Sequence, residues 1–570
     1  MMKYGWRWFS VVAMVVGLFV GSCGDGVQQE TLTLRYWQAP STANPYLTDA
    51  FKDLDAAALV LEPLVNYSED GRLMPRLAAA IPTVENGGIP EDLTSITWEL
   101  KPGILWSDGT PFTAHDAVFT WRYKCSIPDF DCDAESEAIE TMEAVDDLTL
   151  EISFKYPVGF PYDEFVGFDG GKYILQKSQF EGCMGEASRS AQECQQANMM
   201  PIGTGPYKIV EFQFDEAAGT SVVSYERNEN FRVPGQPFFS EVTIQGGGSA
   251  EDAVQAVLSG EADYAWRVQV LPETLEELQE AEHVSVAFAF FSLVERLIIN
   301  LTNPDPELGA RRSEWSPDDP NPHPFLSDPS VREALSLAID RDRIVDDFYG
   351  PTGQPVCNIL TRPAAYASPN NDDCLVQDIE MARDVLDEAG WRPGEDGIRE
   401  KDGVRLSVLY QTSTNDARQG TQELIQEWWE AIGVETVLKH TDASVFFSSD
   451  DNSDSAFRFF ADVQMFADIS TPDHFVTEQI PRADNGWDAN NIPRWSNDEY
   501  DALFTESLTT PPGPRRQEQV IRMNDLVVQD YVLIPLVDRA SVVPFRSDLK
   551  GVRSNALDSE MWNIHEWYRE

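Results

Sequence analysis

The stretch WSDGTPFTAHD occupies residues 106–116 of the 570-residue chain. Within it, Asp108-Gly109 predicts a tight turn, because glycine reaches backbone angles that other residues avoid. Gly203–Pro206 suits the same kind of turn. Trp106 is expected to pack in a core rather than to contact a ligand. With the alternating pattern ITWEL at 96–100, these features predict a region of short strands and turns.

Outside this region the chain shows both strand and helix patterns. Residues 31–37 (TLTLRYW) alternate polar and apolar side chains, as a half-buried strand does. Apolar residues recur about every 3.6 positions in Val331–Val345, and further helices are predicted at Asp378–Ala389 and Arg418–Ile432. Strands and helices without a regular βαβ rhythm predict α/β or α+β lobes rather than a barrel or a bundle.

The N-terminus has the features of an export signal. Lys3 and Arg7 precede an apolar stretch, Phe9–Val20, that is shorter than the about 20 residues needed to span a membrane. Val20-Gly21-Ser22-Cys23 looks like a bacterial lipobox, so residues 1–22 are predicted to be removed and Cys23 to carry lipid. Residues 24–30 would then be a tether, with the protein held at the cell membrane and facing the periplasm or the exterior. An ordinary secretory signal is the alternative.

Six further cysteines lie in close pairs: Cys125 with Cys132, Cys183 with Cys194, and Cys357 with Cys374. Export permits disulfides, and short loops favour pairing in this order, although the connectivity does not follow from the sequence. Zinc binding is the competing interpretation, but no CxxC spacing occurs.

The composition limits the classes of partner. A hydrophobic fraction of 42% supplies material for cores, and a length of 570 residues suggests several domains. A formal charge of −54 argues against binding nucleic acid or an anionic surface. The acidity is spread along the chain. It indicates either attraction of cationic ligands or a solvated surface suited to a salty medium.

Motifs of catalysis are missing from the sequence. It has no HExxH, no GxSxG and no GxxxxGK[ST]. Residues 450–461 imitate the start of a calcium loop, but Ser455 and Ala461 stand where glycine and glutamate are required. The sequence therefore predicts no enzyme, no catalytic residue, no metal site and no cofactor.

Several segments in order resemble the peptide/nickel-binding family of extracellular solute-binding proteins, which includes oligopeptide- and dipeptide-binding proteins. They are Leu61–Leu64 with Asp70-Gly71 and Pro75, residues 106–116, Gly203–Tyr207, Arg227-Asn228, Ser259–Asp263, Val331–Leu335, Ala338–Arg341 and Ala389–Trp391. The match is distributed over most of the chain.

The resemblance implies an α/β, two-lobed fold of the periplasmic-binding-protein kind that closes by hinge bending. Lobe I would take residues 31–70, 200–288 and 536–570, with an inserted subdomain at 71–199, and lobe II would take 289–535. Leu293–Leu301 and Val532–Val537 are natural crossover strands, since strands buried on both faces read as continuous apolar runs.

The resemblance also points to candidate site residues. In peptide-binding relatives an aspartate followed after three residues by proline holds the ligand's α-ammonium, and here that residue is Asp468, before Pro472. Met465 stands where many relatives have tryptophan, which implies a differently shaped pocket. Trp37 and Gln38 follow the first strand, and Arg418 could receive a peptide carboxylate. The alternatives are that Asp468 caps a turn and that Arg418 lies in solvent.

The function implied is capture of oligopeptides or dipeptides in an interlobe cleft and delivery to the permease of an ABC importer, whose ATPases are separate cytoplasmic subunits. The protein is expected to be a monomer. Binding of an oligosaccharide, an opine or a metal chelate is the alternative within the same class. A surface hydrolase or chaperone is the alternative from another class.

Overall fold

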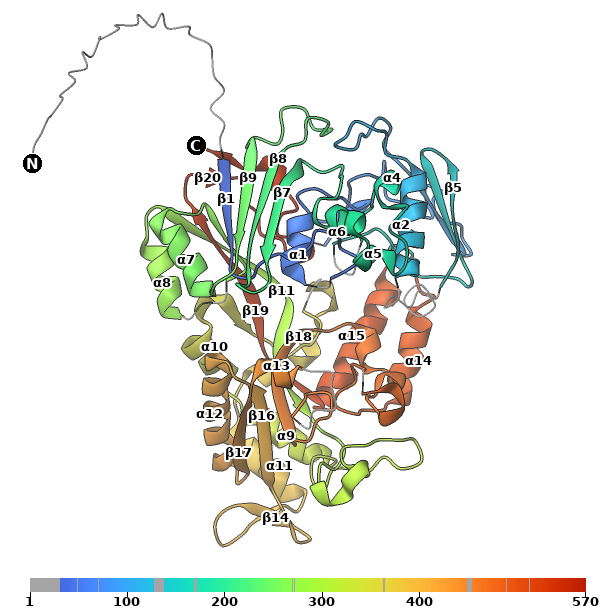
Figure 1. Cartoon of the computed structure of the whole chain (residues 1–570). Coiled ribbons are helices and arrows are strands. Elements are labelled where there is room, and N and C mark those ends of the chain that lie inside the picture. The colour runs from blue at the N-terminus through green and yellow to red at the C-terminus, as the bar shows by residue number, and fades with distance from the viewer. Residues whose placement is uncertain are drawn as a thin grey trace, which may run out of the picture.

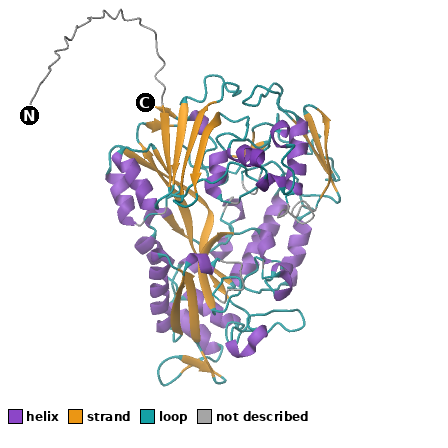
Figure 2. Ribbon diagram, in the orientation of Figure 1, coloured by secondary structure: helices purple, strands orange, loops and turns teal. Residues whose placement is uncertain are grey.

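The computed structural model (Figure 1) describes residues 31–570, except 49, 70, 128–137, 169–171, 269, 271, 362–363, 448–453, 488 and 512. The predicted signal peptide, Cys23 and the tether lie outside the described residues. Strands run through the middle of the molecule and helices flank them (Figure 2).

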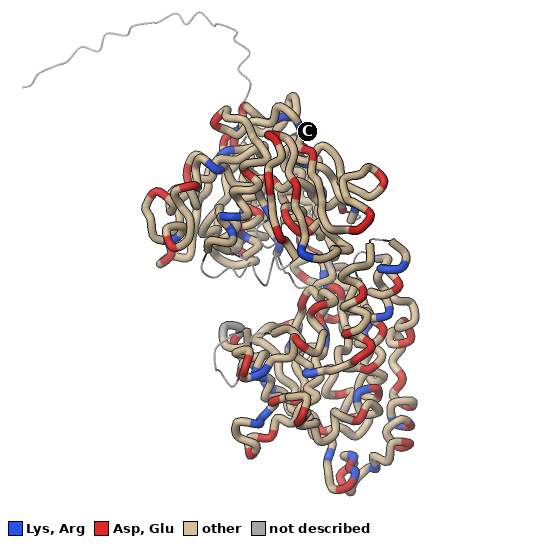
Figure 3. Tube along the Cα trace, turned by 90° about the vertical axis from the view of Figure 1, so that its right-hand side faces the viewer, with Lys and Arg blue, Asp and Glu red and all other residues tan. Residues whose placement is uncertain are grey.

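One sheet connects two lobes. In the described part of the chain it has eleven strands, in the order β17-β16-β18-β11-β19-β10-β1-β9-β8-β7, with β12 paired to β19. The strands are β1 (Thr31–Tyr36), β7 (Tyr207–Asp215), β8 (Thr220–Arg227), β9 (Glu241–Gly246), β10 (Tyr264–Trp266), β11 (Val284–Ile299), β12 (Gly353–Pro355), β16 (Ser407–Ser413), β17 (Glu435–Thr441), β18 (Val463–Ile469) and β19 (Leu533–Arg546). Lobe I carries β1 and β7–β10, and lobe II carries β16–β18. The two lobes form an upper and a lower body joined along one side (Figure 3).

Lobe I is built on β1, β9 and β10, which run parallel. The predicted alternation of β1 is confirmed, because Leu32, Leu34 and Tyr36 are fully buried. Helix α1 (Phe51–Ala57) packs on that face of the sheet, while α7 (Ala250–Ser259) and α8 (Pro272–Glu280) pack on the other.

Lobe II has the same layered design, with β16 parallel to both β17 and β18. One face of its sheet packs against α9 (Pro329–Leu337), α10 (Arg341–Phe348), α11 (Ile379–Glu388) and α12 (Asp416–Ala431). The other face packs against α13 (Ala443–Phe446), α14 (Asp498–Ser507) and α15 (Pro514–Gln529). A small sheet of β13 (Arg392–Pro393), β14 (Arg399–Lys401) and β15 (Val404–Arg405) lies at the far end, and β20 (Leu549–Lys550) pairs with β21 (Tyr568–Arg569) in lobe I.

Two of the predicted helices are confirmed and one is corrected. Helices α11 and α12 occupy the ranges predicted at 378–389 and 418–432 to within two residues. The single helix predicted over 331–345 is two helices, α9 and α10. The break occurs at Asp340, whose side chain accepts a hydrogen bond from the Arg343 amide and so caps a new helix.

The region between α1 and β7 forms a subdomain on lobe I. Its elements are β2 (Val65–Tyr67), β3 (Leu73–Pro75), β4 (Ser95–Glu99), α2 (Ala114–Ser126), β5 (Ile139–Asp146), β6 (Thr149–Phe154), α4 (Lys177–Phe180), α5 (Ala187–Ser190) and α6 (Gln192–Met199). Trp106 is buried in its core, and Gly109 adopts a positive φ of 86° in the predicted turn. Side chains from α2, α4 and α6 also pack into the main core of lobe I, so the subdomain and lobe I form one packed body.

The lobes are joined by β11 and β19, which pair antiparallel from Val284 opposite Arg546 to Ile298 opposite Leu533. The register shifts between Phe290 and Leu293, and Ser292 there has a positive φ of 63°. Beyond the shift, β11 gains β18 as a second neighbour. The shift therefore marks the boundary between the lobes.

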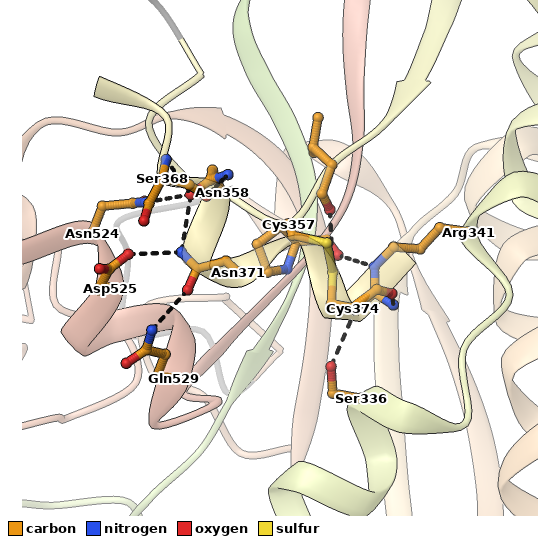
Figure 4. The surroundings of a disulfide bond; sticks show 12 residues. Ser336, Arg341, Cys357, Asn358, Ser368, Asn371, Cys374, Asn524, Asp525 and Gln529 are labelled. Carbon is orange, nitrogen blue, oxygen red and sulfur yellow. Dashed lines mark hydrogen bonds between the residues drawn. A yellow bond between two sulfur atoms is a disulfide. The ribbon is translucent and has the colours of Figure 1, made fainter. Parts of the chain in front are cut away.

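Two of the three predicted disulfides are present, Cys183–Cys194 and Cys357–Cys374. Cys132, of the third predicted pair, lies outside the described residues. Figure 4 shows the surroundings of Cys357–Cys374, where Arg341 donates to the carbonyl oxygen of Cys374 at 2.7 Å. An amide network that includes Asn371 and Asp525, joined at 3.0 Å, ties the same loop to α15.

Candidate ligand-binding site

The carboxyl ends of two sets of parallel strands approach the space between the lobes (Figure 1). Strands β1, β9 and β10 of lobe I end at Tyr36, Gly246 and Trp266, and β16, β17 and β18 of lobe II end at Ser413, Thr441 and Ile469. In open α/β sheets ligands bind outside the carboxyl ends of the strands. This interlobe space is the candidate site.

Asp468 lies at the carboxyl end of β18 and forms an ion pair with Arg296 of β11. Arg296 Nη2 donates to Asp468 Oδ2 at 2.8 Å, and Nη1 donates to Ser470 Oγ at 2.6 Å. The Asp468 side chain is 42% exposed, whereas that of Arg296 is 4% exposed. Among the described residues, Asp468 Oδ1 has no hydrogen-bond partner. Asp468 therefore does not cap a turn, and it keeps one carboxylate oxygen free for another donor.

Arg418 lies in a second ion cluster, centred on Glu295. Arg418 Nε donates to both Glu295 carboxylate oxygens, at 3.2 and 3.1 Å, and Arg539 of β19 donates to Oε1. Burial alone would raise the pKa of Glu295, but the two guanidinium groups outweigh it and hold this pKa below its usual value. Arg418 is therefore buried and ion-paired with Glu295, so the alternative that it lies in solvent is wrong, and its guanidinium group is directed at Glu295.

Met465 also lies away from the interlobe space. Its side chain is fully buried in the core beneath α12, and its Sδ accepts a hydrogen bond from Tyr410 Oη at 3.1 Å. Successive strand residues point to opposite faces, so a residue three positions before Asp468 lies on the other face of β18. The structure therefore places Met465 in the core of lobe II and not in the predicted pocket.

Two aromatic residues beside the Arg296–Asp468 pair, Phe466 and Phe447, were not among the site residues predicted from the sequence. Phe466 shares a face with Asp468, and the Arg296 guanidinium lies 5.9 Å from its ring centroid. The Phe447 ring packs edge-on against Phe466 at 5.6 Å and is 45% exposed. The period-two pattern of β18 was the signal that could have identified Phe466.

Trp37 and Gln38 extend beyond β1. Trp37 lines a cavity of about 310 Å³ together with Tyr349, Asn415 and Arg539, so both lobes contribute to its wall. The indole Nε1 donates to the Arg267 carbonyl oxygen at 3.2 Å, and Gln38 is exposed. The structure thus brings Trp37 near Arg539.

Trp37 and Asp468 lie on opposite sides of the crossover strands. Asp468 pairs with Val294, whereas Arg539 pairs with the next residue, Leu293, and therefore points to the other face. The predicted site residues consequently flank the crossover strands instead of forming one cluster.

The described residues lack two further kinds of feature. There, no group of three or more His, Cys, Asp or Glu side chains is placed to hold a metal ion. In the same ranges, none of the helices combines the length and apolarity required to cross a membrane.

Comparison with known proteins assigns the class. The sequence profile of bacterial extracellular solute-binding proteins, family 5 Middle, matches residues 72–485. Protein XP55 of Streptomyces lividans is 28% identical over 426 residues, which cover 72% of this chain and 67% of that protein. The oligopeptide-binding protein AppA of Bacillus subtilis is 23% identical over 586 residues, which cover 98% of this chain and 97% of AppA.

Solved structures share the fold. NikA from Brucella suis in complex with Fe(III)-EDTA has a TM-score of 0.73 at 20% identity, covering 95% of this chain and 100% of NikA. AppA from Bacillus subtilis in complex with a nonapeptide has a TM-score of 0.67 at 19% identity, covering 95% of this chain and 99% of AppA.

The molecule is thus a two-lobed binding protein of the periplasmic type. It belongs to family 5 of the bacterial extracellular solute-binding proteins. Its relatives are solute-binding proteins of ABC importers, not enzymes, and such proteins work with permease and ATPase subunits.

Proposed function

We propose that this protein captures oligopeptides or dipeptides between its lobes and delivers them to an ABC permease, with Asp468 as the anchor for the α-ammonium group. The observation that carries this proposal is the carboxylate of Asp468, held by Arg296 through one oxygen and half-exposed with the other oxygen free. The solved AppA complex with a nonapeptide supports a peptide as one kind of solute for this fold.

The anchor is electrostatically modest, because Arg296 already balances the charge of Asp468. An incoming ammonium group would share the carboxylate with a guanidinium instead of neutralising a lone charge. The free oxygen supplies a directed acceptor, and its carboxylate charge favours an ammonium group over the neutral amide of an acylated terminus. Phe466 and Phe447 lie next to this acceptor and favour an apolar side chain at the first ligand position.

Isothermal titration calorimetry of the mature protein with peptides of two to nine residues tests the proposal. A binding peptide should lose affinity when its amino terminus is acetylated. Asp468→Asn should weaken the free peptide roughly 30-fold, about 2 kcal/mol, the low end for a buried charge pair because Asp468 is partly exposed. The acetylated peptide should bind the wild type and this variant alike.

Asp473→Asn is the matched control, since this carboxylate is exposed on the following turn. It should leave peptide affinity unchanged. Equal affinity for free and acetylated peptides, or a Kd that Asp468→Asn does not alter, would remove Asp468 as the anchor. If the protein binds an oligosaccharide, an opine or a metal chelate and binds no peptide, its solute belongs to that other class.

We further propose that Cys23 carries the lipid that anchors the protein at the cell membrane. The described chain starts at Thr31, whose carbonyl oxygen accepts a hydrogen bond from Arg569 at 3.3 Å, so both ends of this part of the chain lie together on lobe I. Labelling with a radioactive fatty acid should mark the wild type and not Cys23→Ser, which should also leave the membrane fraction. Equal labelling of both proteins contradicts the proposal.

A further inference from the structure

A second cavity between the lobes contains none of the predicted ligand-binding residues. It has a volume of about 570 Å³, within the range of about 300–1,000 Å³ of small-molecule sites. We call it the aromatic cavity. It is lined by Tyr67, Gly71, Leu73, Phe160, Tyr162, Tyr366, Arg516 and Leu557. They come from the subdomain, from lobe II and from the segment after β19.

The walls of the aromatic cavity meet through direct backbone contact. Gly159 N donates to the Leu508 carbonyl oxygen at 2.7 Å. A Cβ atom on Gly159 would lie 2.5 Å from the Thr510 carbonyl oxygen, so only glycine allows this approach. The subdomain therefore touches lobe II at a point separate from the crossover strands, and the cavity lies beside this contact.

The apolar part of the cavity is aromatic and accessible. Phe160 is 36% exposed, and its ring lies 5.2 Å from that of Tyr162 in an edge-on arrangement. Tyr366 is half-buried. Exposed aromatic surface of this kind favours a ligand with a planar or apolar body.

Arg516 supplies the only positive charge among the lining residues that the structure describes. Its guanidinium group lies 5.7 Å from the Phe160 centroid and donates to the carbonyl oxygens of Ser507 and Thr510. Within the described ranges, no carboxylate lies within ion-pair distance of it. Arg516 is half-buried, so part of this charge faces the cavity.

Two acidic groups on the segments that flank the cavity are already ion-paired. Glu506 pairs with Arg515, and Asp163 pairs with Lys172 at 3.0 Å. In a chain with 96 acidic and 42 basic residues, a guanidinium group without a carboxylate partner beside an apolar cavity is complementary to an anion.

We propose that the aromatic cavity is a second binding site, which takes a small amphiphilic carboxylate with its apolar body against Phe160 and Tyr162 and its carboxylate on Arg516. This site goes beyond the proposed capture of peptides at Asp468. Because its walls belong to both lobes, a bound carboxylate stabilises the lobe orientation in which those walls meet.

The probe for this site is 3-phenylpropionate, and its uncharged match is 3-phenylpropanamide. Calorimetry on the mature protein should show the acid binding at least fivefold more tightly than the amide. Arg516→Gln should abolish this preference while the amide still binds, which separates loss of charge from loss of fold. Arg516→Lys should keep most of the preference, and Phe160→Ala should weaken both probes.

Arg515→Gln is the matched control, because Arg515 is exposed and does not line the aromatic cavity. It should leave both affinities unchanged. Equal binding of acid and amide to the wild type overturns the proposal, as does an acid preference that survives Arg516→Gln. Absence of binding by either probe at millimolar concentration overturns it as well.

Discussion

Glu295 and Arg296 are neighbours in β11, yet their ion pairs differ in kind. Glu295 is fully buried on one face of the sheet, and its carboxylate is taken up by Arg418 and Arg539. Arg296 points to the other face and holds Asp468, whose side chain is 42% exposed. A saturated buried cluster can only hold strands and helices together. A pair with a free and exposed oxygen can accept a new partner.

Lobe I contains a counterpart of the Glu295 cluster. Glu62 is 2% exposed, and Arg232 donates to its two carboxylate oxygens at 2.6 and 2.8 Å. Arg76 lies 3.6 Å away, and Thr204 Oγ1 donates at 3.0 Å. Each lobe therefore contains a buried carboxylate held by two arginines, while Asp468 has the open arrangement.

Removing the charge of Glu295 should give the largest loss of stability. Glu295→Gln leaves the buried Arg418 and the half-buried Arg539 without their shared counter-ion, and we expect the free energy of unfolding to fall by about 3–5 kcal/mol. Urea denaturation followed by circular dichroism measures this. Glu423→Gln, at an exposed position on α12, should change stability by less than about 0.5 kcal/mol. Similar effects of the two substitutions would contradict a structural role for the cluster.

The contribution of the Glu62 cluster to the free energy of unfolding should depend on pH. Burial alone would raise the pKa of Glu62, but Arg232 and Arg76 outweigh it and lower this pKa from 4.5 to about 2. Since the folded-state pKa is depressed, the stabilisation of about 3 kcal/mol is present above pH 4.5 and is lost as pH falls towards 2. The stability difference between wild type and Glu62→Gln should shrink over that interval. A difference that stays constant across this pH range would refute the assignment.

The Arg296–Asp468 pair should show the smallest stability effect. Asp468→Asn keeps an oxygen that can accept from Arg296, and the exposed side of the pair is screened by solvent, so we expect a loss of about 1 kcal/mol or less. This loss should decrease in high salt, whereas the cost of Glu295→Gln should not. Melting curves at low and high sodium chloride concentration test this contrast. A salt-independent loss of several kcal/mol for Asp468→Asn would contradict the difference between the two ion pairs.

Local patterns predicted the elements well. The alternation of β1, the apolar spacing of α11 and α12, and the apolar runs of the crossover strands all depend on side chains near in sequence. The break between α9 and α10 was missed because apolar spacing continues across it, although Asp340 carries the capping signal.

The site was less predictable, because it depends on which strand faces and distant partners meet. Asp468 could be singled out by its family segment, but Met465 faces the core. Arg418 pairs with a residue 123 positions away in the chain. Among 96 acidic residues, no sequence pattern shows which carboxylate meets which arginine. That Trp37 and Asp468 flank the crossover strands follows only from the register of β11, β18 and β19.

The register shift near Ser292 has a mechanical consequence. The chain passes from lobe I into lobe II through β11 and returns through the adjacent β19. Sliding these strands by one residue would turn every side chain to the opposite face. We therefore expect the lobes to move by rotation about the shift, which preserves the ladders on both sides, and not by translation along the strands. Asp468 pairs with Val294, two residues beyond Ser292, and so lies close to the pivot. A ligand held there would stay nearly stationary while the outer rims of the lobes, at the end of a long lever arm, sweep towards each other.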